Sequence, residues 1–127
     1  MNYKFHHVHI VCKDLDRMIS FFTKTLKARL LTMKEFDGAK GAKIDSFGTH
    51  INLRVPLENE QINNPLQGPL GIHHLAFQVD NCDSAYDEIK TEGYRFINGP
   101  KTSGNIRTAF FNGPENIVIE LIQFCNT

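Results

Sequence analysis

The stretch HVHIVCKD at residues 7–14 has a counterpart in HLAFQVD at residues 74–80, and both end in an aspartate just before a predicted helix. Near the end of each half, INL at 51–53 corresponds to IEL at 119–121. The equivalent first and last positions are 45 residues apart in the first half and 46 in the second. A repeat of this length predicts that one structural unit occurs twice in the chain.

Hydrophobic periodicity predicts the same order of elements in both halves, a strand, a helix and three further strands. In the first half we expect a strand at 5–11, a helix capped by Asp14 from 15 to about 27, a short strand at 30–33, a charged turn at 36–41 and a hairpin around Gly48-Thr49 at 42–55. In the second half we expect a strand at 73–79, a helix at 82–93 that ends near Gly93, a short strand at 94–97, a glycine-rich loop or lid at 98–105 and two strands at 107–111 and 117–122.

The predicted fold class is therefore α+β, with two tandem βαβββ modules at about 1–56 and 72–127 and a linker at 57–71, all in a single domain over 1–127. Alternation along the strands separates two faces in each module. The apolar positions would face the helices: Val8, Ile10, Ile51, Leu53, Leu75, Phe77, Ile119 and Leu121. The opposite faces carry His7, His9, His50, Asn52, Arg54, His74, Gln78 and Glu120. If the two concave faces close on one another, these polar side chains gather in one site.

Two histidines and a carboxylate in this set form a candidate metal site. His7 and His74 occupy equivalent positions of the repeat, and Glu120 lies on the strand that the repeat places beside them. Imidazole and carboxylate ligands that leave coordination positions open suit a divalent first-row metal in a catalytic site. Taken singly, each residue is more simply a hydrogen-bonded or solvated polar side chain. The matched positions favour joint ligation of one divalent ion: Zn, Ni, Co, Mn or Fe.

Three segments resemble the signature blocks of the vicinal oxygen chelate superfamily, which includes glyoxalases, bleomycin resistance proteins and dioxygenases: FHHVHIVCKDLDRMISFF (5–22), GIHHLAFQVDNCDSA (71–85) and NIVIELIQ (116–123). Within it, INLRVPLENE (51–60) followed by GIHHLAFQVDN (71–81) is most similar to methylmalonyl-CoA epimerases and small bacterial glyoxalase I enzymes. The resemblance implies paired modules that form a cupped mixed sheet around a divalent metal. It also implies a homodimer, which would cover exposed sheet edges.

By this resemblance the metal ligands come from four positions, namely His7, residue 52, His74 and Glu120. The family usually has Glu or Gln at residue 52, whereas this chain has Asn, a shorter and weaker donor. Either Asn52 or His50, on the same face, is therefore expected in or near the fourth position, or the site has three protein ligands. The substrate pocket would be lined by His9, His50 and Arg54, with Arg54 a candidate contact for an anionic group.

Composition argues against several partners and locations. The 127 residues include 14 Lys or Arg and 14 Asp or Glu, so the net charge is zero, and there is no basic run. Nucleic acid and anionic membranes are therefore not expected partners. The N-terminal sequence has no apolar segment of signal-peptide length, no apolar run could span a bilayer, and the three cysteines are too scattered for a disulfide framework. We expect a cytoplasmic protein that acts on a small molecule.

The expected function is that of a metal-dependent lyase or isomerase of the glyoxalase I or methylmalonyl-CoA epimerase type, which transfers a proton alpha to a carbonyl. Glu120 would be a metal ligand and also the main proton-handling residue. Chemistry with one base is slightly favoured over two-base epimerisation, because Asn52 cannot accept the proton. A second base would have to be His50, His9 or a carboxylate such as Asp45.

Three other functions stay open. A thiol transferase of the fosfomycin-resistance type shares the two-histidine, one-glutamate set and the length, but usually has a hydroxyl residue where this chain has His9. An Fe(II) ring-cleaving dioxygenase also uses two histidines and a glutamate, but most are considerably longer. A non-catalytic small-molecule-binding protein of the bleomycin-resistance type lacks the metal ligands that this chain carries.

Overall fold

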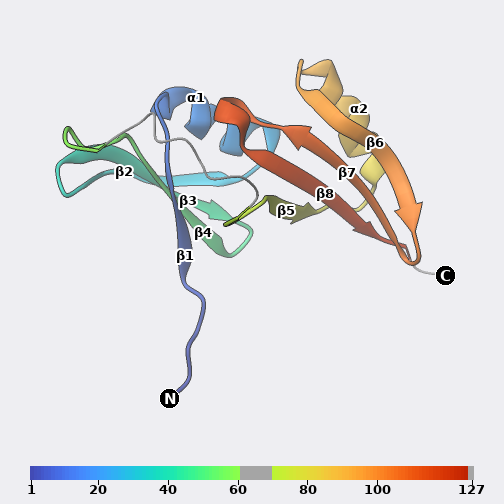
Figure 1. The fold of residues 1–127 in the computed structure, drawn as a ribbon, viewed down its shortest axis with the longest axis horizontal. Coiled ribbons are helices and arrows are strands. Elements are labelled where there is room, and N and C mark those ends of the chain that lie inside the picture. Colours follow the sequence, from blue (N-terminus) through green and yellow to red (C-terminus); the bar gives the residue numbers. More distant parts are fainter. Residues whose placement is uncertain (61–69, 126–127) are drawn as a thin grey trace. The chain divides into compact units, whose positions relative to one another are not determined.

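The computed structural model describes residues 1–60 and 70–125 and divides the chain into two compact units, residues 1–65 and 66–127 (Figure 1). The first unit contains β1 (His7–Val11), α1 (Leu15–Ser20), η1 (Phe21–Thr25), β2 (Arg29–Phe36), β3 (Ala39–Ser46) and β4 (Thr49–Arg54). The second contains β5 (Leu75–Gln78), α2 (Cys82–Thr91), β6 (Arg95–Ser103), β7 (Ile106–Asn112), η2 (Pro114–Asn116) and β8 (Val118–Phe124). The predicted α+β class and the duplicated βαβββ order are confirmed.

Each unit is built on a four-stranded mixed sheet with the same topology. The strand order is β1-β4-β3-β2 in the first sheet and β5-β8-β7-β6 in the second. In both, the first strand pairs parallel with the last, and the remaining pairs are antiparallel. The register also repeats, since His9 pairs with Asn52 and Ala76 pairs with Glu120. Residue 52 therefore occupies in the first unit the position that Glu120 occupies in the second.

Helix α1 begins at the predicted capping residue Asp14, and α2 is capped by Asn81, one residue after the aspartate that the sequence places before it. The Asp14 carboxylate accepts a hydrogen bond from the backbone N–H of Arg17 at 3.0 Å, and the Asn81 amide oxygen accepts one from the N–H of Ser84, also at 3.0 Å. Such caps satisfy donors that the first turn of a helix leaves unpaired. The first predicted helix continues from α1 directly into the π-helical turn η1 and ends near Lys27, which has a positive φ of 61°.

The core of each unit lies between its sheet and its helix. Phe22, Ile44 and Leu53 are fully buried in the first unit, as are Phe111 and Ile119 in the second. Helix α2 contacts β6, β7 and β8, and α1 contacts β4. The predicted apolar face is thus confirmed on the central strands, where burial of several large side chains supplies most of the favourable free energy.

Two predictions for connecting segments are wrong. Residues 98–105 do not form a loop or lid, because β6 continues through Ser103 and pairs with β7. Gly99 and Pro100 are accommodated by register shifts between Phe96 and Lys101, and β6 is the edge strand of its sheet. Bulges and edge positions are where a sheet tolerates glycine and proline.

The charged turn predicted at 36–41 is also shorter in the structure. Only Asp37 and Gly38 separate β2 from β3, and both have a positive φ, 52° and 91°. The strand predicted at 30–33 correspondingly extends over Arg29–Phe36. Most of the linker predicted at 57–71 lies outside the described residues, which omit 61–69. Across the part of the chain that is described, no helix has the length and apolar character needed to cross a membrane.

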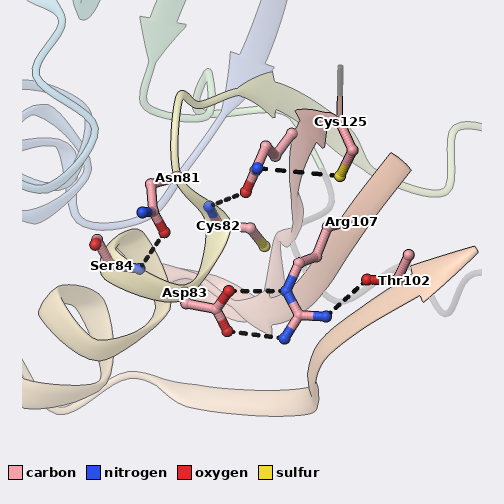
Figure 2. Close-up of polar contacts among 8 residues, drawn as sticks. Asn81, Cys82, Asp83, Ser84, Thr102, Arg107 and Cys125 are labelled. Atoms are coloured by element: carbon pink, nitrogen blue, oxygen red, sulfur yellow. Dashed lines mark hydrogen bonds and ion pairs between the residues drawn. The ribbon is translucent and has the colours of Figure 1, made fainter. Parts of the chain in front are cut away.

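A polar network joins α2 to two strands of its sheet (Figure 2). Arg107 of β7 donates from Nε and Nη2 to the two carboxylate oxygens of Asp83, at 2.8 and 2.9 Å, and from Nη1 to the Thr102 hydroxyl at 2.8 Å. The backbone N–H of Cys82 donates to the side-chain oxygen of Gln123 at 2.7 Å. The bidentate contact with Asp83 orients the Arg107 guanidinium, whose third hydrogen bond helps to hold Thr102 in β6. Thr102 lies within the segment that the sequence predicts as a loop.

We expect truncation of the equivalent core residues Leu53 and Leu121 to destabilise the protein. They are 0% and 1% exposed, and replacing either by alanine should lower the free energy of unfolding by about 2–5 kcal/mol, because a cavity is left behind. The control Leu31→Ala alters a residue on β2 that is 42% exposed and should change stability by about 0.5 kcal/mol or less. Urea denaturation measures all three. A Leu121→Ala variant as stable as the control would contradict the burial.

The Asp83–Arg107 pair should make stability depend on pH in acid. The hydrogen bond from Arg107 lowers the pKa of Asp83, so the pair stabilises the fold above the ordinary carboxyl pKa. This contribution is lost as the pH falls through the lowered folded-state pKa. The difference in Tm between wild type and Asp83→Asn should be present at pH 7 and shrink below about pH 4. In an Arg107→Ala background the same substitution should have little effect at either pH, and an unchanged effect there would contradict the coupling.

Candidate metal centre

Two of the three predicted ligands meet in the second unit. His74 directly precedes β5 and Glu120 lies in β8, which pairs with β5. The His74 Nε2 and Glu120 Oε1 atoms are 3.0 Å apart, and the side chains are 30% and 15% exposed. The Phe110 ring packs edge-on against His74 with the ring centroids 5.2 Å apart. An imidazole and a carboxylate thus converge in a half-buried position, as the repeat predicted.

The other ring nitrogen of His74 also has a partner. His74 Nδ1 lies 2.8 Å from Nδ1 of His73, with the two rings nearly perpendicular. One tautomer satisfies both contacts: His73 donates from Nδ1 to His74 Nδ1, and His74 donates from Nε2 to Glu120. The same arrangement occurs in the first unit, where the Nδ1 atoms of His6 and His7 are 2.8 Å apart. The contact at Nδ1 fixes the orientation of each ring. The opposite tautomer, in which His74 donates from Nδ1 to His73, would leave Nε2 unprotonated, as a metal-binding histidine requires.

Asn52 stands out in the first unit because its polar side chain is buried without compensation. It is 6% exposed. Among the residues that the structure describes, its Oδ1 is the buried side-chain nitrogen or oxygen atom that has no hydrogen-bond partner. Leaving such an atom unpaired is costly, so it calls for a donor or a cation. Its place in the repeat, opposite His9 and equivalent to Glu120, puts residue 52 on the predicted ligand face.

His50, the other candidate for the fourth ligand, has a different environment. Its Nε2 lies 3.6 Å from Oδ1 of Asp45, its neighbour on β3, and the Asp45 carboxylate also lies 3.9 Å from Nη2 of Arg29. The ring of His6 lies 6.0 Å from that of His50, centroid to centroid. His50 thus has an anionic partner, whereas the Asn52 oxygen has none, so Asn52 fits the fourth position better.

The two remaining pocket candidates, His9 and Arg54, lie on the same face of the first sheet. His9 packs against Phe36 with ring centroids 4.6 Å apart, and its pKa is lowered by burial and by the positive charge of Arg54. The Arg54 guanidinium forms a fork with Glu60, Nη1 to Oε1 at 2.6 Å and Nη2 to Oε2 at 2.8 Å. Sequence patterns do not single out Glu60, although its position six residues after Arg54, beyond Pro56, is compatible with a chain that turns back.

These donors suit a divalent metal. A histidine nitrogen, a carboxylate and an unpaired amide oxygen are the ligands that first-row metals accept in open catalytic sites. Over residues 1–60 and 70–125, no group of three or more His, Cys, Asp or Glu side chains is close enough together to hold an ion. The predicted ligands come from both units: His7 and Asn52 from the first, and His74 and Glu120 from the second. Participation of His7 stays a prediction.

Comparisons with known proteins cover almost the whole chain. A lactoylglutathione lyase from Pseudomonas aeruginosa is 25% identical over 95% of this chain and 82% of its own length. A 2-epi-5-epi-valiolone epimerase from Actinomyces sp is 29% identical over 93% of this chain and 78% of its own length. The chain spans about half of some other relatives, such as 49% of a lactoylglutathione lyase from Schizosaccharomyces pombe.

Solved structures share the fold at low sequence identity. A glyoxalase family protein from Bacillus cereus superimposes with a TM-score of 0.86 at 20% identity, over 99% of this chain and 97% of that one. The fosfomycin resistance protein FosX from Listeria monocytogenes, solved with Mn(II) and sulfate, gives a TM-score of 0.70 at 19% identity, over 100% and 95% of the two chains. The family model described as "Glyoxalase/Bleomycin resistance protein/Dioxygenase superfamily" matches residues 4–121. With the duplicated βαβββ unit and this match, the chain belongs to the glyoxalase/bleomycin resistance protein/dioxygenase superfamily.

Proposed function

We propose that the protein is a metal-dependent lyase or isomerase of the glyoxalase I or epimerase type, which moves a proton on the carbon next to a carbonyl. The observation that carries the proposal is the 3.0 Å contact between His74 and Glu120, at positions whose equivalents in the first unit include His7 and the unpaired Asn52 oxygen. Relatives named as lactoylglutathione lyase and as an epimerase support the same class of reaction.

In this proposal one divalent ion, Zn, Ni, Co, Mn or Fe, is held by His7, His74 and Glu120, with the Asn52 amide oxygen as the fourth donor. When bound, the ion would stabilise the negative charge that develops on a substrate carbonyl oxygen as the adjacent carbon loses its proton. The chain supplies the orientation of the donors, because His6 and His73 each hold the neighbouring ring through Nδ1. For Nε2 to serve as a ligand, His7 and His74 would each carry their proton on Nδ1 and donate it to the neighbouring histidine, which is the opposite tautomer to the one that donates to Glu120.

Glu120 is the proposed proton carrier. Its carboxylate is 15% exposed, so solvent reaches it only partly, and its position beside His74 keeps it within hydrogen-bond reach of a substrate held there. A carboxylate in this position can take the proton from carbon and return it to the neighbouring atom of the same face. Asn52 stands where a second carboxylate would act as a partner base. One-base transfer is therefore favoured over epimerisation with two bases, for which Asp45, His50 or His9 would have to serve.

A thiol transferase of the fosfomycin-resistance type is the second candidate. The likeness to FosX extends over the whole chain, and that protein was solved with Mn(II). Against this candidate, the residue two positions after the first histidine is His9, packed on Phe36, where that group usually has a hydroxyl. A small-molecule substrate fits either activity. The homodimer and the cytoplasmic location stay predictions.

Metal binding is the first test. The purified protein should bind about one divalent ion per chain, and His7→Ala or Glu120→Ala should remove most of it, because each deletes a ligand from an open site. Gln78→Ala is the matched control, since Gln78 lies in β5 on the same face of the sheet as Glu120 and is not a proposed ligand. Elemental analysis after equilibrium dialysis gives the metal content, and circular dichroism confirms folding. Full metal content in a His7→Ala/Glu120→Ala double variant would overturn the assignment.

The proton-transfer step predicts solvent exchange at the substrate carbon. In D₂O the metal-loaded protein should incorporate deuterium into the hemithioacetal of methylglyoxal or into 2-methylmalonyl-CoA, as followed by NMR. Glu120→Gln, assayed with its metal content measured, should lose about 10²–10⁴-fold in exchange rate, since a general base is removed. Asp45→Asn should leave exchange intact if a single base acts. Absence of exchange on any carbonyl compound, together with thiol addition to an epoxide or uptake of dioxygen, would refute the proposed reaction.

A further inference from the structure

The contact between Arg54 and Glu60 gives the first unit a charged feature beside its ligand face. Arg54 is the last residue of β4 and lies two positions beyond Asn52, on the same side of the strand. Its side chain is 17% exposed, and both Nη atoms donate to the Glu60 carboxylate, at 2.6 and 2.8 Å. Nη1 also donates to the backbone oxygen of Val55 at 3.2 Å. The guanidinium is therefore largely covered, with its fork filled by a carboxylate.

We propose that the Arg54 guanidinium is a subsite for a carboxylate group of the substrate, and that Glu60 is its internal occupant, which the substrate carboxylate displaces. The proposal deepens the function proposed above and rests on it for the location of the reacting carbon. A planar guanidinium recognises a carboxylate through two parallel hydrogen bonds, which is the geometry that Glu60 adopts. Glu60 thus has the chemistry that we assign to the ligand.

Exchange of one carboxylate for another is feasible because the carboxylate is the more exposed member of the pair. Arg54 is mostly buried and would be left without a counter-ion if Glu60 simply moved away, which is unfavourable for a desolvated charge. Glu60, in contrast, is 37% exposed and can be solvated outside the pair. Replacing its two hydrogen bonds by two from a substrate keeps Arg54 neutralised throughout. An anion that cannot displace Glu60 has no net attraction to the site, because the Glu60 carboxylate already balances the charge of Arg54.

The surrounding charges sharpen this selectivity. Glu60 also accepts a hydrogen bond from the backbone N–H of Leu57 at 2.6 Å, and together with Arg54 this lowers the pKa of Glu60 to about 2. Asp37 is a second carboxylate near enough to raise the pKa of Arg54. With both carboxylates nearby the subsite has no excess positive charge. Departure of Glu60 removes one negative charge and frees the two Nη donors of Arg54 for another carboxylate.

The position of Arg54 also limits the class of substrate. Two residues along a strand span about 7 Å, so the carboxylate would bind roughly that far along β4 from the Asn52 side chain. If the reacting carbonyl lies near Asn52, the substrate is an oxo or hydroxy acid whose carboxylate is separated from the reacting centre by a short carbon chain. This length is shared by five-carbon dicarboxylates, which makes glutarate a suitable probe of the subsite.

The test measures glutarate binding to the metal-free, full-length protein, so it does not depend on the metal or on the reaction. Isothermal titration gives the affinity, and the Arg54 Nε–H signal in a ¹⁵N-resolved NMR spectrum reports on the guanidinium itself. Glu60→Gln should tighten binding by about tenfold if Glu60 fills the subsite about nine-tenths of the time. Arg54→Gln should abolish binding, and Arg54→Lys should weaken it, because the bidentate fork is lost.

Glu58→Gln is the matched control, since it removes the same charge from the same exposed segment, two residues away from Glu60. It should leave the affinity for glutarate close to that of the wild type. Gln at position 60 retains a side-chain oxygen that can accept from Leu57, so the local backbone is conserved, and Glu60→Ala gives the same titration if Glu60→Gln folds poorly. Equal affinities for wild type and Glu60→Gln, or equal gains for Glu58→Gln, would overturn the displacement. Tighter binding by Glu60→Gln without any deuterium exchange would leave the subsite standing and refute the proposed reaction alone.

Discussion

Parallel pairing between the first and last strands of each unit is the constraint on which the rest of the structure depends. Two parallel strands cannot be joined by a tight turn, so the chain must cross over one face, and here the crossover begins with a helix. In each unit the paired strands are neighbours in the sheet, β1 with β4 and β5 with β8, and in the sequence the helix and two more strands come between them. The face that the helix leaves open displays the polar side chains of both paired strands, which is why the candidate ligands lie there.

The repeat is nearly symmetrical in its backbone but not in its chemistry. The paired positions are His9 and Asn52 in the first unit and Ala76 and Glu120 in the second. The second unit therefore contributes a carboxylate that contacts His74 directly, whereas the first contributes a buried amide oxygen without a partner. A neutral donor at position 52 lowers the negative charge of the site and leaves Glu120 as the carboxylate among the proposed ligands. This difference, more than the shared fold, distinguishes the chemistry open to this chain.

Each unit has one bidentate arginine–carboxylate pair among its described contacts, and the two pairs connect different elements. The Arg107 guanidinium donates to Asp83 and Thr102, and so helps to hold α2 against the second sheet and β6 beside β7. Arg54 is equally committed, but its partner Glu60 is on an exposed segment just after the first sheet rather than on a packed helix. The same bidentate contact therefore joins a helix to the sheet in one unit, whereas in the other it joins the last residue of β4 to the segment that follows it, and this second pair is the one that we propose to exchange.

The sequence by itself determined the duplicated βαβββ order, the helix cap at Asp14, the buried positions of the central strands and the placement of Glu120 beside His74. These follow from local periodicity and from equivalent spacing in two copies, which the backbone must satisfy in the same way twice. Only the tertiary structure decided that 98–103 is an edge strand, since its glycine and proline are tolerated through bulges that depend on β7. The orphaned oxygen of Asn52 and the partner of Arg54 were likewise decided by the fold, because burial and contacts between side chains depend on neighbours that local sequence patterns do not specify.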